Sequence, residues 1–248
     1  MIRTAVARAG LCALVVSFAT PSPGQTLAGG SGHSLVLKPD GTVWSFGVNS
    51  NGQIGNNTLT NQPTPQQVAG LIDVVAVAAG AQHSMALTSA GTLYVWGDNY
   101  YGQVGDDSTT DRKVPVQSSL TNVVAIAAGE YHSVALTSTG DVYTWGRNTN
   151  GQLGTGNTTQ SKIPVLIATG ATAIGAGYDH TLLVKTDGTV WAAGLNSSGQ
   201  LGDASTTQRP SPVQMTGIST ATAVAGGDQH SLILLSDGTL KATGANSS

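Results

Sequence analysis

Short apolar runs alternate with glycine-bearing turns and polar loops, and the same order of segments returns about every 50 residues. The clearest copy contains Val123–Ala128 (VVAIAA), Ser133–Thr137 (SVALT), a turn at Ser138–Gly140 and Asp141–Gly146 (DVYTWG). Short β-branched and aromatic runs separated by glycine turns predict antiparallel strands. No segment has the spacing of an amphipathic helix. We therefore predict an all-β protein.

A fourth strand is predicted in each unit from a proline-bearing segment, namely Val114–Gln117, Ile163–Leu166 and Ser211–Gln214. Proline cannot donate a ladder hydrogen bond, so this strand is limited to a sheet edge. Four short strands per unit predict a β-propeller of four-stranded blades, with about five blades encoded. We count the edge strand as the first strand of the blade that follows it, which leaves three strands, from Thr26 to Asn49, for the first blade.

The repeat also sets the expected domain boundaries. The units are roughly 25–73, 74–122, 123–170, 171–220 and an incomplete 221–248, forming one β-propeller repeat domain over residues 25–248. One position of the unit carries all five histidines, with spacings of 50, 49, 48 and 50 residues: His33, His83, His132, His180 and His230. A fixed period in this range is typical of one supersecondary unit used repeatedly.

Small and aromatic positions predict how the blades pack. Gly80, Gly129 and Gly177 end an Ala-rich strand, where small residues let backbones approach closely near a propeller axis. Aromatic residues two positions apart share a strand face and are expected to fill the space between blades: Trp44, Tyr94, Tyr143 and Trp191, and then Phe46, Trp96 and Trp145. The last unit has Lys241 and Thr243 instead, so we expect it to be the least well packed.

Residues 1–24 are predicted to be a secretory signal peptide. Arg3 and Arg8 precede the short apolar stretch Gly10–Ala19, which is too short to span a bilayer as a mature helix. The only cysteine, Cys12, lies in this segment, which is consistent with export of a chain without disulfides. We expect a secreted protein, extracellular or periplasmic; a disordered or membrane-anchoring amino terminus is the alternative.

Charge excludes some classes of partner. Charged residues are 9% of the chain, the formal net charge is −3, and the only adjacent cations are Arg112 and Lys113. Without a basic stripe to neutralise phosphates, we expect no nucleic-acid partner. No amphipathic helix is visible for a membrane surface, so no membrane contact is expected beyond the export signal.

The repeated histidines do not predict catalysis or metal binding. One histidine per blade in an identical context predicts an identical structural role, a bond between adjacent strands or blades. Metal sites need several converging ligands, whereas these histidines fall on separate blades. Asp106, Asp107 and Asp111 are the one acidic cluster, which we interpret as a solvated turn in preference to a Ca²⁺ site. We predict no enzyme activity, no metal and no cofactor.

Strand parity predicts a binding face. If consecutive strands are antiparallel, the two residues before each histidine and the long connection after each W-G segment emerge on the same side. On this side the unit-specific residues are Gln82, Tyr100, Tyr101, Glu130, Tyr131, Tyr178, Asp179, Asp228 and Gln229. Tyrosines mixed with acids on variable loops of a rigid scaffold indicate a protein-binding patch. Ordinary loop variation is the alternative.

The pattern G-x-x-H-[ST], a glycine turn, and then W-G-x-N-x-x-G-Q-[LIV]-G closely resembles the regulator of chromosome condensation repeats over Thr26–Ser248. The resemblance implies a propeller that usually has seven blades, so we expect a truncated seven-bladed ring. A five-bladed ring whose first blade has lost a strand is the alternative. If the ring is open, its bare edges allow self-association.

These observations lead to one hypothesis and two alternatives. The hypothesis is a secreted scaffold that binds an extracellular protein or other macromolecule and has no catalysis of its own. The resemblance implies that aromatic residues before the repeat histidine, here Tyr131 and Tyr178, make partner contacts. It also implies an alternative, a guanine-nucleotide exchange factor-like regulator of a small GTPase. The second alternative, a propeller enzyme acting on a cell wall or glycan, would need a unit-specific acid or base pointing inward, and the sequence offers none.

Overall fold

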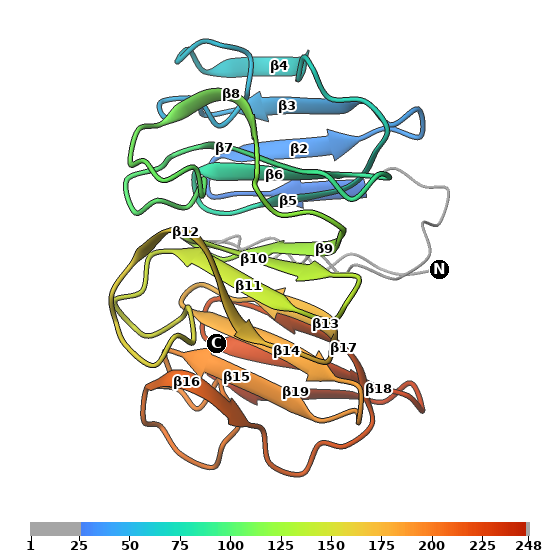
Figure 1. Cartoon of the computed structure of the whole chain (residues 1–248), viewed down its shortest axis with the longest axis vertical. Helices are drawn as coiled ribbons and strands as arrows, with labels where there is room; N and C mark the ends of the chain where they lie inside the picture. Colours follow the sequence, from blue (N-terminus) through green and yellow to red (C-terminus); the bar gives the residue numbers. More distant parts are fainter. Residues whose placement is uncertain (1–25, 247–248) are drawn as a thin grey trace.

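The computed structural model describes residues 26–246, which form five antiparallel sheets (Figure 1). The first sheet contains β1 (Thr26–Gly29), β2 (His33–Leu37), β3 (Val43–Gly47) and β4 (Gln62–Gln67). The second contains β5 (Val74–Ala79), β6 (His83–Thr88), β7 (Leu93–Gly97) and β8 (Arg112–Gln117). The third contains β9 (Val123–Ala128), β10 (His132–Thr137), β11 (Val142–Gly146) and β12 (Ser161–Ala168).

The fourth sheet contains β13 (Ala171–Ala176), β14 (His180–Lys185), β15 (Val190–Gly194) and β16 (Arg209–Gln214). The fifth contains β17 (Ala221–Gly226), β18 (His230–Leu235) and β19 (Leu240–Gly244). None of the described residues forms a helix, and so none provides a helix that could cross a membrane. The predicted signal peptide, residues 1–24, lies outside the described residues.

The sheets are the blades of a propeller. Within each sheet the strands follow chain order, and the first strands of successive sheets contact one another, β1 with β5, β5 with β9, β9 with β13 and β13 with β17. The first strand of each sheet is therefore the inner one, and the proline-bearing strand is the outer edge. In Figure 1 the blades follow one another from the blue end of the chain to the red end. The prediction of an all-β propeller with about five blades is confirmed.

The assignment of the edge strand to the following blade is wrong. β4 pairs with β3, with Trp44 opposite Gln67, and β8, β12 and β16 likewise pair with the strand before them. The edge strand therefore closes its own unit, the first blade has four strands, and the three-stranded sheet of the described chain is the last one. The alternative in which the first blade lacks a strand is also wrong.

The cause of this pairing lies in the loop before each edge strand, which turns the chain back. Asn49 is buried, donates through Nδ2 to the carbonyl oxygens of Thr58 and Thr60, and accepts at Oδ1 from the backbone N–H of Ile54. Residues Asn99, Asn148 and Asn196 hold the same kind of loop in the next three units. The G-Q-[LIV]-G segment is thus part of a compact loop and does not begin a crossing to another blade.

The core lies between blades. Trp96 and Trp145 are fully buried and donate from Nε1 to the backbone carbonyls of Gln53 and Gln103 in the preceding blade, at 2.9 and 2.8 Å. This confirms the inter-blade role predicted for that position. The other predicted aromatic residues are only partly buried: Trp44, Phe46, Tyr94, Tyr143 and Trp191.

The two end blades of the described chain are covered on one side only. Leu27 on β1 is 63% exposed, whereas Val77 at the equivalent position of the second blade is buried. Leu240 on β19 is 62% exposed, whereas its counterpart Val190 is buried. β19, the third strand of the last blade, is more exposed than the third strands β11 and β15 of the two blades before it. The prediction that the last blade is the least well packed is therefore confirmed.

Candidate functional site

Each seam between blades is closed by a repeated polar pair. His33, His83, His132 and His180 lie with Nε2 at 2.9, 3.1, 3.1 and 2.9 Å from a Ser or Thr hydroxyl of the next blade. These hydroxyls belong to Ser84, Ser133, Thr181 and Ser231. The predicted structural role of the histidines is confirmed for these four.

The hydrogen bonds fix the state of each imidazole. The Ser133 hydroxyl donates its single proton to the carbonyl oxygen of Gln103, 2.9 Å away, so it must accept from Nε2–H of His83. Burial lowers the pKa of His83 to about 3, which keeps the ring neutral. These histidines are therefore buried, neutral hydrogen-bond donors and are not placed to act as general bases.

The loops before the histidines are joined to one another across the seams. Ala81 N–H donates to Glu130 O, Glu130 N–H to Tyr178 O, and Tyr178 N–H to Gly227 O, at 2.9 to 3.0 Å. Glycine begins each of these loops because a Cβ at Gly129 would lie 2.1 Å from Cε1 of His132 and 2.6 Å from the carbonyl oxygen of Gly177. This confirms the close backbone approach predicted for these glycines and gives the side chains between them a rigid base.

Three tyrosines from two neighbouring loops lie together on this side of the propeller. The rings of Tyr100 and Tyr101 meet edge-on with their centroids 4.9 Å apart. The ring centroids of Tyr101 and Tyr131 are 5.4 Å apart. The backbone of Tyr101 is held by a 2.9 Å bond to the side chain of Gln103. Strand parity therefore placed the long loop and the loop before the histidine on one side correctly.

Arg147 lies at the centre of this cluster. Its guanidinium carbon is 5.6 Å from the Tyr101 ring and 5.8 Å from the Tyr131 ring, within the range of a cation–π contact. Its Nη1 donates to Glu130 Oε2 at 2.9 Å and lies 3.7 Å from Asp179 Oδ1. One cation thus links two tyrosine rings to two carboxylates.

The two carboxylates are held differently. Asp179 is buried and accepts from Asn150 Nδ2 at 2.8 Å and from Gln152 Nε2 at 2.6 Å. Glu130 accepts from Arg147 Nη1 at 2.9 Å. Burial raises the pKa of both carboxyl groups above the ordinary range, and burial together with Glu130 raises the pKa of Tyr178.

We call this set the tyrosine–acid face: Tyr100, Tyr101, Glu130, Tyr131, Arg147, Tyr178 and Asp179. Its exposed parts are Tyr100 at 70% and Tyr178 at 37%. The other predicted residues lie beside it, without ring contacts or ion pairs to it: Gln82 contributes its backbone carbonyl to Asp98 N–H, Asp228 is exposed, and Gln229 accepts from Ser198. Asp228 still adds negative charge, since it contributes to the raised pKa of Glu130.

The sequence interpretation missed Arg147. It occupies the variable position of W-G-x-N, where the units carry Val48, Asp98, Arg147 and Leu195. A unit-specific charge at this position was a usable signal. The position directly follows the third strand of the blade, and its backbone N–H bonds to the loop before the histidine, as Arg147 does to the carbonyl oxygen of Tyr131. Asp98 is the second such charge, and its buried carboxylate accepts from Gln103 Nε2 at 2.7 Å.

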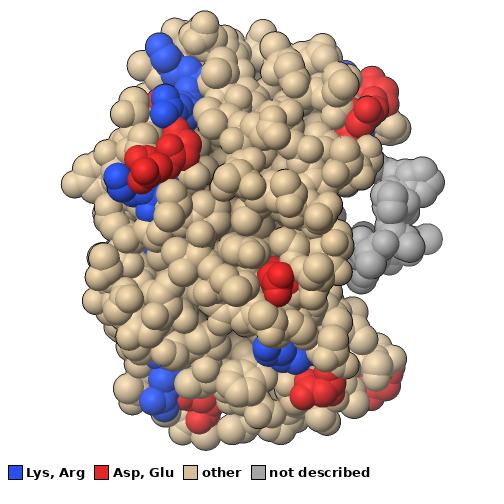
Figure 2. All heavy atoms as spheres, viewed as in Figure 1, with Lys and Arg blue, Asp and Glu red and all other residues tan. Residues whose placement is uncertain are grey.

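The acidic loop is engaged internally. Asp106 is bonded by Arg112, Asn99 and Ser108, and Asp111 by Asn99 and Asn51. Among residues 26–246 no group of His, Cys, Asp and Glu side chains is arranged to hold a metal ion. Figure 2 shows charged side chains in small separate groups on a mostly uncharged face, with no continuous basic band.

Comparison with known proteins gives one family and several solved structures. The family described as RCC1-like domain matches residues 12–248. Yeast RCC1 (Prp20), solved bound to Kap60, is 27% identical with a TM-score of 0.77, over 88% of this chain and 55% of that chain. Human WBSCR16 is 25% identical with a TM-score of 0.78, over 89% of this chain and 61% of that one.

A second structure of Prp20p from Saccharomyces cerevisiae, described with its binding properties to Gsp1p and histones, is 27% identical with a TM-score of 0.75. That match covers 88% of this chain and 56% of the other. The chain therefore spans a little over half the length of these similar proteins.

Proposed function

Because the chain belongs to the RCC1-like domain family, we propose that it is a propeller scaffold that binds another protein through the tyrosine–acid face. The observation that carries this proposal is the contrast between exposed rings and a fixed base. Tyr100 and Tyr178 are exposed, while the backbone of Tyr178 is hydrogen-bonded across the seams on both sides and the backbone N–H of Tyr100 donates to Asp98 within its own loop. Rigid aromatic side chains offer contact area at low entropic cost, which is typical of protein-binding surfaces.

The charge of the face favours a cationic partner surface. Glu130 and Asp179 of the face, together with the adjoining Asp228, outnumber its single cation, Arg147. The way Arg147 lies over two tyrosine rings and beside two carboxylates is an internal example of guanidinium binding. A partner's Arg or Lys side chain beside Tyr178 and Asp228 would find the same ligand types.

The similar proteins support protein binding in general. Yeast Prp20 is described with Kap60, Gsp1p and histones as partners. We further propose that the protein is exported and has no catalysis of its own. Support comes from the amino-terminal charge and hydropathy pattern and from the structural role of the histidines.

The test is affinity capture with two tyrosine variants. Tyr100→Ser and Tyr101→Asn introduce the residues that the first unit carries at the same positions, Ser50 and Asn51, so the fold should tolerate them. We expect the double variant, and Tyr178→Ser, to lose at least about tenfold in affinity for the captured protein. Asp187→Ser, on an exposed hairpin of the opposite side, is the matched control and should bind normally. Unchanged capture by the tyrosine variants would contradict the proposal.

Guanine-nucleotide exchange is the second candidate, favoured by the likeness to yeast RCC1. Nucleotide release from a panel of small GTPases separates the two candidates. Acceleration by the unmodified chain that is lost with Tyr178→Ser would assign exchange to this face. Release rates equal to the spontaneous rates would leave the scaffold function.

A further inference from the structure

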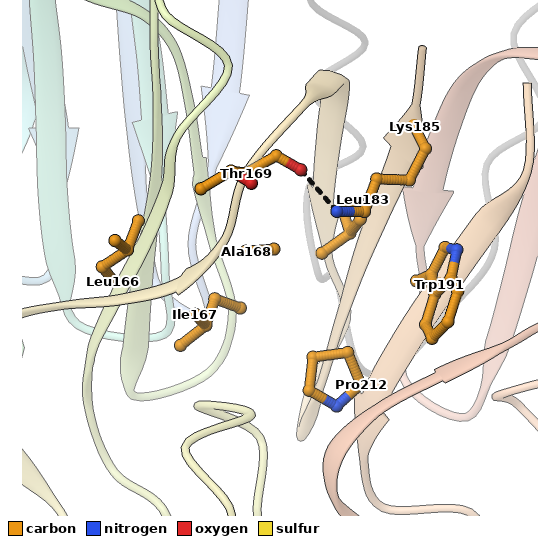
Figure 3. A pocket seen from close by; sticks show the side chains of 8 residues that line it. All are labelled: Leu166, Ile167, Ala168, Thr169, Leu183, Lys185, Trp191 and Pro212. Atoms are coloured by element: carbon orange, nitrogen blue, oxygen red, sulfur yellow. Dashed lines mark hydrogen bonds between the residues drawn. The ribbon is translucent and has the colours of Figure 1, made fainter. Parts of the chain in front are cut away.

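A pocket opens on the outer side of the seam between the third and fourth blades. Its volume is about 530 Å³, and its walls are Leu166, Ile167, Ala168, Thr169, Leu183, Lys185, Trp191 and Pro212 (Figure 3). The first four come from the end of β12 and the turn that follows it, and the others come from β14, β15 and β16. The pocket is thus formed by two adjacent blades that fail to meet fully.

The sequence explains the opening at this seam. Three residues before the next inner strand, the other crossings carry Leu71, Leu120 and Ile218 in the turn after the edge strand, whereas here the same count reaches Ala168 at the end of β12. Leu71 and Ile218 are buried within inter-blade clusters, and Leu120 packs against another. The crossing is also shorter, since Ala171 follows Pro164 after seven positions, whereas Val74 follows Pro65 after nine. Ala168 is still part of β12, where it pairs with Val142, and the turn after it consists of Thr169 and Gly170. This shorter turn supplies no large apolar side chain to fill the space between the two blades.

The walls combine an apolar surface with one cation. Leu183 is buried at the base and the partly buried Trp191 ring forms one side. The Lys185 ammonium donates to the carbonyl oxygen of Thr169 at the rim, as Figure 3 shows. An ammonium has three donors, so further acceptors can bind beside Thr169. Asp187, on the same hairpin, accepts from the backbone and hydroxyl of Thr189 at 3.0 and 2.6 Å.

We propose that this pocket binds a small amphipathic anion, an aromatic or branched aliphatic carboxylate. The apolar part lies against Ala168, Leu183 and Trp191, and the carboxylate accepts from Lys185. The volume of the pocket is within the range of small-molecule sites, and its walls combine apolar and polar surface with one charged group, as an amphipathic ligand requires. The site adjoins the Lys185–Gly188 hairpin, on the side away from the loops before the histidines, so it does not depend on the tyrosine–acid face.

The experiment uses the full chain and two matched probes, 4-phenylbutyrate and its neutral amide, in titration calorimetry and saturation-transfer NMR. We expect the carboxylate to bind about fivefold more tightly than the amide, since a partly exposed ion pair contributes little more than that. Lys185→Met should make the two affinities equal. Ala168→Leu, which introduces the residue of the first two crossings, should abolish binding of both.

The proposal is overturned by no binding of either probe to the unmodified chain, by equal affinities for the two probes, or by binding that survives Ala168→Leu. If Ala168→Leu does not fold, Lys185→Met decides the matter, because Lys185 is partly exposed and its loss removes only one hydrogen bond to a backbone carbonyl. A preference for the carboxylate that persists in Lys185→Met would also overturn the assignment.

Discussion

The imidazole Nε2 of His132 lies 3.1 Å from Oγ1 of Thr181 in the neighbouring blade. That hydroxyl donates in turn to the carbonyl oxygen of Gln152, 2.7 Å away. In the second and third blades a tryptophan also donates to the equivalent carbonyl, but the fourth blade has Ala193 at that position. At this seam the Thr181 hydroxyl is thus the only side-chain donor to that carbonyl, whereas each of the first two seams has a tryptophan N–H as well.

Thr181→Val removes that hydroxyl and preserves the shape of the side chain. We expect the free energy of unfolding to fall by about 3 kcal/mol, because two buried groups, an N–H and a carbonyl, lose their partner. Urea denaturation measures the change. Thr186→Val, at an exposed turn position, is the control. A loss no larger than that of the control would show that the seam does not need this bond.

Stability should fall in mild acid. Burial lowers the pKa of His83 and His132 to about 3 and of His33 and His180 to about 4, whereas an unfolded histidine has a pKa of about 6.5. Below the unfolded value the unfolded chain takes up protons that the folded chain does not, so the free energy of unfolding decreases as the pH falls from about 6.5 toward about 4. The urea midpoint, measured from about pH 7.5 to about pH 5, should decrease steadily.

His83→Gln tests the origin of that pH dependence. Glutamine keeps an N–H donor for Ser133 but does not titrate. The number of protons taken up on unfolding, which sets the slope of the free energy of unfolding against pH, should therefore decrease by about one. The raised pKa values of Glu130 and Asp179 have the opposite effect, since they make the free energy of unfolding increase as the pH falls. Both carboxyl groups are present in the variant and the parent, so their effect cancels in the comparison. Identical slopes for the variant and the parent would assign the acid sensitivity to other groups.

Gly129→Ala should prevent normal assembly of the third and fourth blades. The added methyl group would overlap the His132 ring and the Gly177 carbonyl, at 2.1 and 2.6 Å, and the backbone of two loops would have to move. We expect a loss of more than about 4 kcal/mol or no soluble folded protein. Gly70→Ala is the control, because its Cβ meets nothing within 4 Å and its cost is limited to the positive φ of 78°. Similar thermal unfolding of the two variants would contradict the close approach.

Arg147→Leu introduces the residue that the next unit carries at the same position, Leu195. Glu130 loses its cation, so we expect a loss of about 2 kcal/mol at neutral pH. The pKa values of Glu130 and Asp179 should rise further, and protonation then relieves the unpaired charge. The difference from the parent should therefore shrink as the pH falls through those raised values.

Urea denaturation at two pH values measures the effect of Arg147→Leu, and Glu130→Gln in the same background should recover part of the loss. A deficit that is independent of pH would mean that Arg147 acts by packing on Tyr101 and Tyr131 and not by charge.

The period of the repeat was enough to predict the strands, the number of blades and the structural role of the histidines. Those features recur, and a residue type that recurs at one position reports a shared environment. The edge strand was assigned to the wrong blade because alternating strand directions allow it to pair either with the strand before it or with a strand of the next unit. The choice depends on Asn49 and its equivalents, whose hydrogen bonds to the loop turn the chain back.

The candidate face was only partly visible in the sequence. Tyr101 and Tyr131 were placed together correctly, because strand parity is a local property. Arg147 was missed, although its position varies between units, because ion pairs with Glu130 and Asp179 join residues 17 and 32 positions away. The pocket at Ala168 was missed as well, since a missing side chain becomes visible only where two blades meet.

The histidine-to-hydroxyl bonds give every seam a fixed polarity. A blade always offers an imidazole and a glutamine carbonyl to its successor and receives neither from it. The same joint thus recurs at each of these seams and always points in one direction. The natural segment for recombination runs from one histidine to the next, and transplanting such a segment would carry a binding loop to a new place on the propeller while leaving the joints intact.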